Sequence, residues 1–171
     1  MGLQKKAKWL LMFSIMTIVV GCGFHLRGNV SFPEEYKTVY IDSNEPEFSR
    51  DSIEFYVKRQ LSSQLTFVDT KETADLIIHI NEGFNTRVVA SNASGSTRDY
   101  TTDIVARIGV TNSSGQQILP AQNFTKSRNF TINERAPLAR TNAEESIARD
   151  LAEDLSIDFI RRLITVIQAE Q

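Results

Sequence analysis

The only cysteine of this chain, Cys22, follows a small residue at the end of the only long apolar run, which spans residues 9–20. Three lysines and no acidic residue precede that run. A cationic start, an apolar stretch and a small residue before a cleavage point are the three parts of a secretory signal. As a helix the run extends about 18 Å, short of the roughly 30 Å of a bilayer's hydrocarbon core. We therefore predict that residues 1–21 are a signal peptide rather than a permanent transmembrane helix.

The thiol of Cys22 is suited to covalent modification. The residues Val19, Val20 and Gly21 before it resemble a bacterial lipobox. In that motif the cysteine sulfur receives a diacylglycerol, the signal is removed, and the new α-amino group receives a fatty acid, here expected to be palmitate. Several acyl chains hold a protein at a membrane far more strongly than one myristoyl chain does. The alternative is a plain signal peptide or short anchor with an incidental cysteine.

A lipidated tether is predicted to connect Cys22 to the folded part. Residues 29–37 are polar and contain Pro33, so we assign residues 22–37 to this tether and residues 22–171 to a single domain. In the bacterial lipoproteins that the lipobox resembles, an aspartate after the cysteine commonly retains the protein at the inner membrane. Gly23 occupies that position here, which indicates the outer membrane, with the body facing the periplasm.

Catalysis and metal binding have few candidate residues. One cysteine excludes an intramolecular disulfide, and one cysteine with two histidines cannot complete a four-ligand structural zinc site of nitrogen and sulfur. The sequence has no glycine-rich phosphate loop, Gly-x-Ser-x-Gly elbow or His-Glu-x-x-His helix. His25 and Cys22 lack a positioned third partner, and His79 lies in an apolar run that favours a structural histidine. We predict no enzyme activity, metal or cofactor.

The charge distribution bears on the partners. The 171 residues are 41% hydrophobic and 23% charged, as in an ordinary globular protein. Without the first 21 residues the chain carries 16 basic and 21 acidic residues, a balance that argues against nucleic acid as a partner. Residues 84–132 carry a net charge of +3, and the rest of the mature chain carries −8. This cationic segment is either a contact for phosphorylated or carboxylated ligands or a solvated sheet face, and both remain open.

The first half of the chain predicts strands and one helix. Residues 38–41 are β-branched and aromatic, as is typical of a strand, and residues 74–80 and 84–91 predict two more strands. Between the strands at residues 38–41 and 74–80, Ser49 is expected to cap a helix, with Phe48 as part of a hydrophobic staple. The apolar stripe of this helix consists of Ile53, Val57, Leu61 and Leu65.

The next residues predict a β-rich block. Residues 100–111 alternate, with Tyr100, Thr102, Ile104, Ala106, Ile108 and Val110 on one face. A turn at residues 112–115 leads into a last strand at residues 117–132, where Phe124 and Phe130 share their parity with Lys126 and Arg128. A bulge or an edge position near Pro120 would reconcile these residues with a sheet.

A long amphipathic helix is predicted at the end of the chain. Residues 141–144 form a capping-box sequence, and an apolar residue recurs every fourth position at Ile147, Leu151, Leu155, Phe159 and Leu163. Acidic residues gather near its beginning and Arg161 and Arg162 near its end, which would complement the helix dipole. The order of elements predicts an α+β fold, with two helices packed on one face of a mostly antiparallel sheet.

The residues Gly21 to Arg27, with the sequence Gly-Cys-Gly-Phe-His-Leu-Arg, resemble the start of the mature part of the lipopolysaccharide-assembly lipoproteins of the LptE family. The resemblance continues in order through the strand at residues 38–41, the first helix, a strand around Tyr100 and the last helix. It therefore covers essentially the whole mature chain. It implies two helices against a sheet of about four strands.

The resemblance also implies a role. LptE-family proteins plug the lumen of the large outer-membrane β-barrel LptD, help to assemble it, bind lipopolysaccharide and promote its delivery to the outer leaflet. A one-to-one complex with an LptD-like barrel is then expected. In the family, contact with lipopolysaccharide is attributed to basic residues in loops of the sheet. By position the best counterparts are Arg98 and Arg140, and Lys126 and Arg128 are further candidates.

Two other classes of function remain as alternatives. The chain could be an envelope lipoprotein with a structural or small-ligand carrier role and no barrel partner. A lipid-anchored hydrolase is the weakest alternative, and it would require turnover that depends on His79.

Overall fold

Eight elements follow one another in the part of the chain that the computed structural model describes, namely residues 32–33, 35–44, 52–93, 95, 97–133 and 138–169. In chain order they are β1 (Thr38–Ser43), α2 (Ile53–Leu61), β2 (Thr66–Phe67), the 3-10 helix η1 (Lys71–Thr73), β3 (Leu76–Ser91), β4 (Thr97–Asn112), β5 (Gln117–Asn133) and α3 (Ala139–Ala169). The predicted signal peptide, Cys22 and most of the predicted tether lie outside the described residues.

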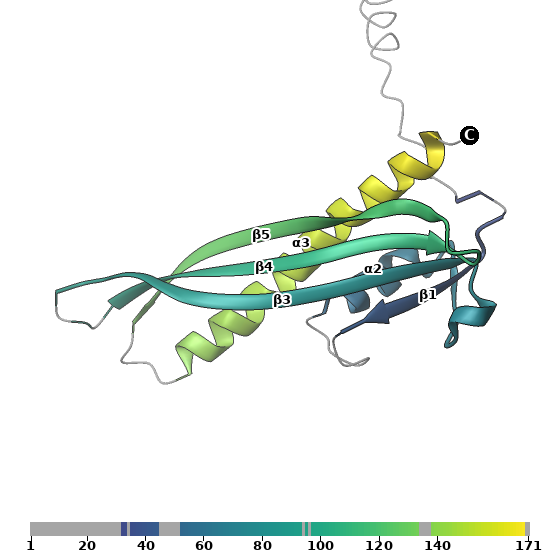
Figure 1. The fold of residues 1–171 in the computed structure, drawn as a ribbon. Coiled ribbons are helices and arrows are strands. Elements are labelled where there is room, and N and C mark those ends of the chain that lie inside the picture. The colour runs from purple at the N-terminus through teal and green to yellow at the C-terminus, as the bar shows by residue number, and fades with distance from the viewer. Residues whose placement is uncertain are drawn as a thin grey trace, which may run out of the picture. The chain divides into compact units, whose positions relative to one another are not determined.

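The five strands form one sheet in the order β2-β1-β3-β4-β5 (Figure 1). Strand β1 runs parallel to β2 and β3, whereas β3, β4 and β5 are antiparallel. The predicted mostly antiparallel α+β fold is confirmed, and the expected strand count of about four is corrected to five. The additional strand is β2, whose two residues pair with Thr38 and Val39 and are too few to leave a sequence pattern.

The two strands predicted at residues 74–80 and 84–91 are one strand of 16 residues, β3. Glu82 and Gly83, which separate the two apolar patterns, pair with Ala106 and Val105 of β4 without interruption. Pairing with a continuous neighbour keeps the backbone extended there. The register of β3 against β4 shifts later, between Val88 and Ala90.

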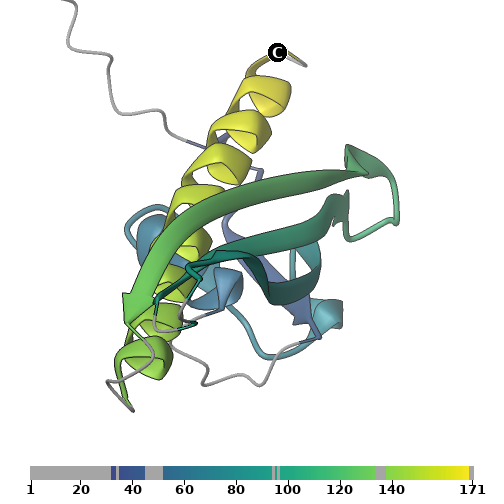
Figure 2. The ribbon, with the colours of Figure 1, turned by 90° about the vertical axis from the view of Figure 1, so that its left-hand side faces the viewer.

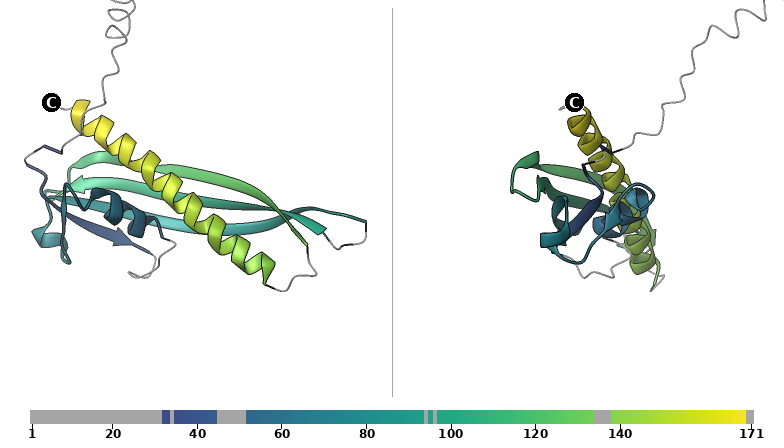
Figure 3. Two further views of the ribbon diagram at one scale, coloured as in Figure 1. Left: turned by 180° about the vertical axis from the view of Figure 1, so that it is seen from behind. Right: turned by 90° about the vertical axis from the view of Figure 1, so that its right-hand side faces the viewer.

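Helices α2 and α3 cover the same face of the sheet. The strands lie in front of both helices in Figure 1, and both helices lie in front of the strands in the left view of Figure 3. Figure 2 shows α3 crossing the strands obliquely. The predicted arrangement of two helices on one sheet face is therefore confirmed.

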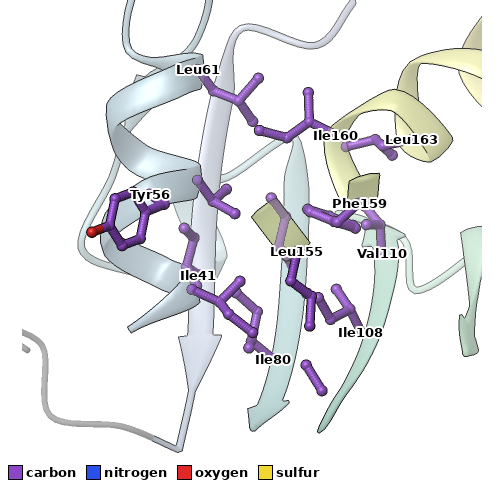
Figure 4. Close-up of a cluster of buried hydrophobic side chains, with 14 of the residues drawn as sticks. Ile41, Tyr56, Leu61, Ile80, Ile108, Val110, Leu155, Phe159, Ile160 and Leu163 are labelled. Carbon is purple, nitrogen blue, oxygen red and sulfur yellow. The ribbon is translucent and has the colours of Figure 1, made fainter. Parts of the chain in front are cut away.

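The core lies between the helices and the sheet. Every residue predicted for the two apolar helix stripes is buried, although Leu65 lies beyond the end of α2, and every residue predicted for the inner face of β4 is buried as well. Figure 4 shows Leu61 of α2 and Leu155, Phe159, Ile160 and Leu163 of α3 gathered with side chains of the strands. Burying one side chain of this size contributes about 1.5–3 kcal/mol, so this layer is the main source of stability.

The beginnings of both helices differ from the prediction. The residue that caps α2 is Ser52, whose hydroxyl accepts a hydrogen bond from the N–H of Phe55, whereas Ser49 and Phe48 lie outside the described residues. Helix α3 begins at Ala139, so Thr141 stands inside the helix and is not its cap. The terminal turns of α3 contain no acidic residue at the start and no basic residue at the end. The prediction that charged residues at the two ends of this helix complement its dipole is therefore wrong. Helix α3 extends beyond its apolar stripe at both ends, so these charged residues do not lie in its terminal turns.

The side chain of Glu82 joins β3 to the beginning of α2. Its carboxylate accepts a hydrogen bond from the backbone N–H of Ile53 at 3.0 Å. The amide of Asn44 forms hydrogen bonds with the backbone N–H and C=O of Glu82 at 2.8 and 3.0 Å. A carboxylate is favourable at the positive end of a helix, which accounts for a buried acid in this position.

Strand β5 is the edge strand of the sheet, and it carries an irregularity near Pro120. The register against β4 shifts between Ile108, which pairs with Gln122, and Val110, which pairs with Leu119. The prediction of a bulge or an edge position near Pro120 is confirmed in both respects. At this point Gly109 faces Ala121 so closely that a Cβ on Gly109 would lie 3.0 Å from the Cα and Cβ of Ala121.

Candidate functional site

The hairpin that joins β3 to β4 carries the first predicted ligand contact, Arg98. Gly95 adopts a positive φ of 67° in the turn, a conformation that glycine takes without steric cost. The side chain of Asn92 accepts a hydrogen bond from the N–H of Thr97 at 3.1 Å, which closes the hairpin. Arg98 then lies at the beginning of β4, opposite Ile132 at the end of β5.

The second predicted contact, Arg140, lies at the same end of the sheet. Its Cζ atom is 4.9 Å from the centroid of the ring of Tyr100, which follows Arg98 by two residues and therefore faces the same side of β4. The ring of Tyr100 is buried and stacks on Phe130 of β5, with centroids 5.2 Å apart. The structure thus brings Arg98 and Arg140 to one end of the sheet, around an aromatic pair.

Several large apolar side chains are exposed near these arginines. Val88, which pairs with Tyr100 across β3 and β4, is 51% exposed, and Val89 is 62% exposed. Leu138, two residues before Arg140, is 70% exposed. Cations beside exposed aliphatic side chains suit a ligand that has both an anionic group and hydrocarbon chains. We call Arg98, Arg140, Val88, Val89 and Leu138 the amphiphilic end.

The other two predicted contacts, Lys126 and Arg128, lie in the middle of β5 and have different partners. The Nζ atom of Lys126 is 2.5 Å from Oδ2 of Asp158 on α3. Arg128 forms ion pairs with Asp150 and Asp154 of the same helix. The structure therefore does not bring these residues into the amphiphilic end, and their charges are compensated by α3.

Two features of this region were not predicted from the sequence. The aspartates at positions 150, 154 and 158 recur every fourth residue, a spacing that places them on one side of a helix and could have indicated a partner row of cations. The stack of Tyr100 on Phe130 depends on the register of β4 against β5, which the sequence pattern does not specify.

His79 belongs to a small polar cluster on the other face of the sheet. Its Nδ1 atom is 3.1 Å from Oδ2 of Asp42, and Nζ of Lys71 is 2.9 Å from the same oxygen. The hydrogen bond from Lys71 is the main cause that lowers the pKa of Asp42, and the same contact raises the pKa of Lys71. This cluster connects β1, η1 and β3, in keeping with the structural interpretation of His79.

Two further properties concern the described residues as a group. None of their helices is both long enough and apolar enough to cross a membrane. Nowhere in the described ranges do three or more histidine, cysteine, aspartate or glutamate side chains gather in a way that would hold a metal ion.

The fold is shared with known bacterial lipoproteins. Lipoprotein B from Nitrosomonas europaea superimposes with a TM-score of 0.67 and 20% sequence identity, over 86% of this chain and 94% of that protein. The rare lipoprotein B from Shewanella oneidensis gives a TM-score of 0.63 and 11% identity, over 79% of this chain and all of that protein. At these identities the comparison establishes the fold alone.

Sequence comparison identifies the family. The chain is 28% identical over 152 residues to the LPS-assembly lipoprotein LptE of Pectobacterium atrosepticum, covering 87% of this chain and 80% of that protein. It is 26% identical over 166 residues to the protein of the same name from Photorhabdus laumondii, covering 95% and 87% respectively. The family model LptE, described as lipopolysaccharide-assembly, matches residues 36–163. This match spans all the strands and most of α3, and the chain therefore belongs to the LptE family.

Proposed function

We propose that this chain is an outer-membrane lipoprotein that acts with an LptD-like β-barrel to assemble lipopolysaccharide into the outer leaflet. The match of the LptE family model to residues 36–163 is the observation that carries the proposal. The relatives from Pectobacterium and Photorhabdus are both named as LPS-assembly lipoproteins. In this role the chain binds and positions a lipid and a protein partner, and it needs no catalytic cleft.

The surface of the sheet suits a plug inside a barrel. On the face away from the helices, β5 exposes the uncharged polar residues Asn123, Thr125, Ser127, Asn129 and Thr131. Three of them form side-chain hydrogen bonds within the sheet: Asn129 accepts from Thr101 and Thr131 donates to Asp99, both at 2.7 Å, and Ser127 donates to Asp103 at 2.5 Å. The interior of a transmembrane β-barrel is polar, so a body with this polar strand surface can be enclosed in it.

The amphiphilic end suits lipopolysaccharide, whose lipid part carries both phosphates and acyl chains. Arg98 and Arg140 supply guanidinium groups that pair well with phosphate oxygens. Arg140 is already oriented, because its guanidinium packs on Tyr100 and its Nε donates to Glu144 at 2.9 Å. Val88, Val89 and Leu138 supply apolar surface next to these charges. We therefore assign Arg98 and Arg140 as the principal contacts, with Lys126 and Arg128 as structural ion pairs.

Charge reversal at the amphiphilic end tests this assignment. The double variant Arg98→Glu with Arg140→Glu should bind lipopolysaccharide at least about tenfold more weakly than the parent protein, since one lost charge-assisted contact corresponds to that factor or more. The fold should persist, because both residues are on the surface. Binding is measured with purified protein and fluorescent lipopolysaccharide, and folding by circular dichroism.

The matched control is the double variant Arg59→Glu with Arg162→Glu, which makes the same change of net charge at exposed positions of α2 and α3. It should bind lipopolysaccharide as the parent does. Equal binding by the Arg98/Arg140 variant and the parent would reject the assigned contacts.

A further inference from the structure

Among the described residues on the face of the sheet away from the helices, Arg107 is a cation with no counter-ion. Val105 and Arg107 alternate with the buried residues of β4, so both point away from the helices, and both are exposed. Figure 1 shows this face in front of the helices. No residue of the described part of the chain forms an ion pair or a side-chain hydrogen bond with Arg107, whereas Arg87, on the same face, is paired with Asp103.

A hollow opens beside Arg107. It has a volume of about 340 Å³, and its lining includes Asn81, Arg107, Gly109 and Ala121. The hollow lies next to Gly109, at the point where the register of β5 shifts and Ala121 packs closely against this glycine. Asp42 and His79 also line it, but Lys71 already compensates the charge of Asp42. The uncompensated charge at the hollow is therefore that of Arg107.

The neighbours of Arg107 favour contact with a protein surface. In the strand register Arg107 lies between Asn81 of β3 and Asn123 of β5. Val105, 44% exposed, lies opposite Gly83, so the surface beside this valine is flat. Arginine is enriched among the central residues of protein interfaces. A guanidinium next to amide groups is matched by the two oxygens of a carboxylate.

We propose that the sheet face around Arg107 docks on the barrel partner, and that an aspartate or glutamate side chain of the barrel wall enters the hollow and pairs with Arg107. The inference rests on the proposed function, because it takes the β-barrel as the occupant. Charge complementarity identifies the partner group: beside the hollow Arg107 is flanked by the neutral amides of Asn81 and Asn123, and no described residue pairs with its guanidinium. The amphiphilic end uses other residues, so barrel docking and lipid contact occupy separate parts of the sheet.

The test compares barrel capture by two single variants of the full chain. Tagged Arg107→Glu and Arg162→Glu are each expressed in place of the parent protein, extracted from the envelope in mild detergent and purified, and the retained barrel is quantified by mass spectrometry. Arg162 is exposed on α3 and has no described ion-pair partner, so its reversal matches the change of net charge. We expect at least about a tenfold loss of barrel with Arg107→Glu and no loss with Arg162→Glu.

Each other outcome overturns the inference in a distinguishable way. Equal capture by Arg107→Glu and the parent rejects the docking site and leaves the proposed function intact. Equal loss with both variants identifies a general charge effect. If Arg107→Glu weakens binding of purified protein to lipopolysaccharide and leaves barrel capture unchanged, the hollow takes a lipid anion instead. If the parent protein retains no barrel after purification, the proposed function itself is rejected.

If Arg107→Glu lowers the thermal midpoint of unfolding, the variant Arg107→Gln is used in its place, and a smaller loss of barrel capture is expected.

Discussion

At the scale of single residues, Asp75 shows how one carboxylate holds two strands in register. Its Oδ2 atom accepts hydrogen bonds from the backbone N–H groups of Lys37 and Thr38 at 2.9 and 2.8 Å, and from the hydroxyl of Thr38 at 2.8 Å. The N–H of Asp75 donates in turn to Thr38. These bonds connect the beginning of β1 to the beginning of β3, where no turn joins the two parallel strands.

The pH dependence of this contact can be predicted. The hydrogen bonds from Lys37 and Thr38 lower the pKa of Asp75 below its ordinary value of 3.8. A lowered pKa in the folded state stabilises the protein above pH 3.8, and this stabilisation disappears as the pH falls through the folded-state pKa. Asp75→Asn should therefore reduce the free energy of unfolding by about 1–2 kcal/mol at neutral pH, with a smaller difference in acid.

Chemical denaturation at pH 7 and at pH 3 measures both effects. Asp69→Asn is the control, because Asp69 is exposed and has no side-chain hydrogen bond with the described residues. A destabilisation by Asp75→Asn that stays constant between the two pH values would contradict the role given to the charge.

The four basic residues predicted as ligand contacts differ in how far the sequence alone could indicate their surroundings. Arg98 and Arg140 were selected by matching their positions to the loop contacts that the family resemblance implies, and they stay a prediction as ligand contacts. The structure places both at one end of the sheet, with Arg98 in β4 and Arg140 in the first turn of α3. The charges of Lys126 and Arg128 looked equivalent in the sequence. Their compensation by α3 depends on which helix packs on β5, and a local pattern contains no information about that long-range contact.

At the scale of elements, packing of α3 on the sheet separates two kinds of contact. Phe159 is completely buried and meets Phe124 of β5 edge to face, with centroids 6.0 Å apart. Lys126 and Asp158 pair nearby with their side chains 34% and 42% exposed. Removing a buried aromatic ring leaves a cavity, whereas an exposed ion pair contributes little because water and salt screen it.

We therefore expect Phe159→Ala to lower the free energy of unfolding by about 3–5 kcal/mol, and Lys126→Met to lower it by less than about 1 kcal/mol. Lys126→Met keeps most of the aliphatic side chain and removes only the charge. Urea denaturation followed by circular dichroism measures both values. Similar losses for the two variants would show that the ion pairs, and not the apolar layer, hold α3 on the sheet.

The elements that could be predicted are those with a local periodicity. The apolar stripes of both helices and the alternation of β4 identified the buried faces correctly. Strand β2 and the continuity of β3 could not be predicted, because both depend on pairing with strands distant in the sequence. The true beginning of α2 depends partly on Glu82, 29 residues away, which accepts the N–H of Ile53.

At the scale of the whole molecule, the proposed function requires a lipid anchor in addition to the folded body. Cys22 is the predicted attachment residue and lies outside the described residues. Cys22→Ala should leave the precursor without acyl chains and with its signal uncleaved. Intact-mass measurement of the membrane fraction checks this. If the variant carries the same acyl chains as the parent protein, Cys22 is rejected as the anchor.

With its folded body and its lipid anchor, the chain is proposed to work as one half of a complex with an outer-membrane β-barrel. The most direct measurement is purification of the tagged full-length protein from its own envelope in mild detergent, with identification and quantification of every retained protein. We expect one large β-barrel protein of the LptD type at about one copy per copy of this chain. Recovery of the chain alone at several detergent strengths would contradict the barrel partnership and favour a structural or carrier role in the envelope.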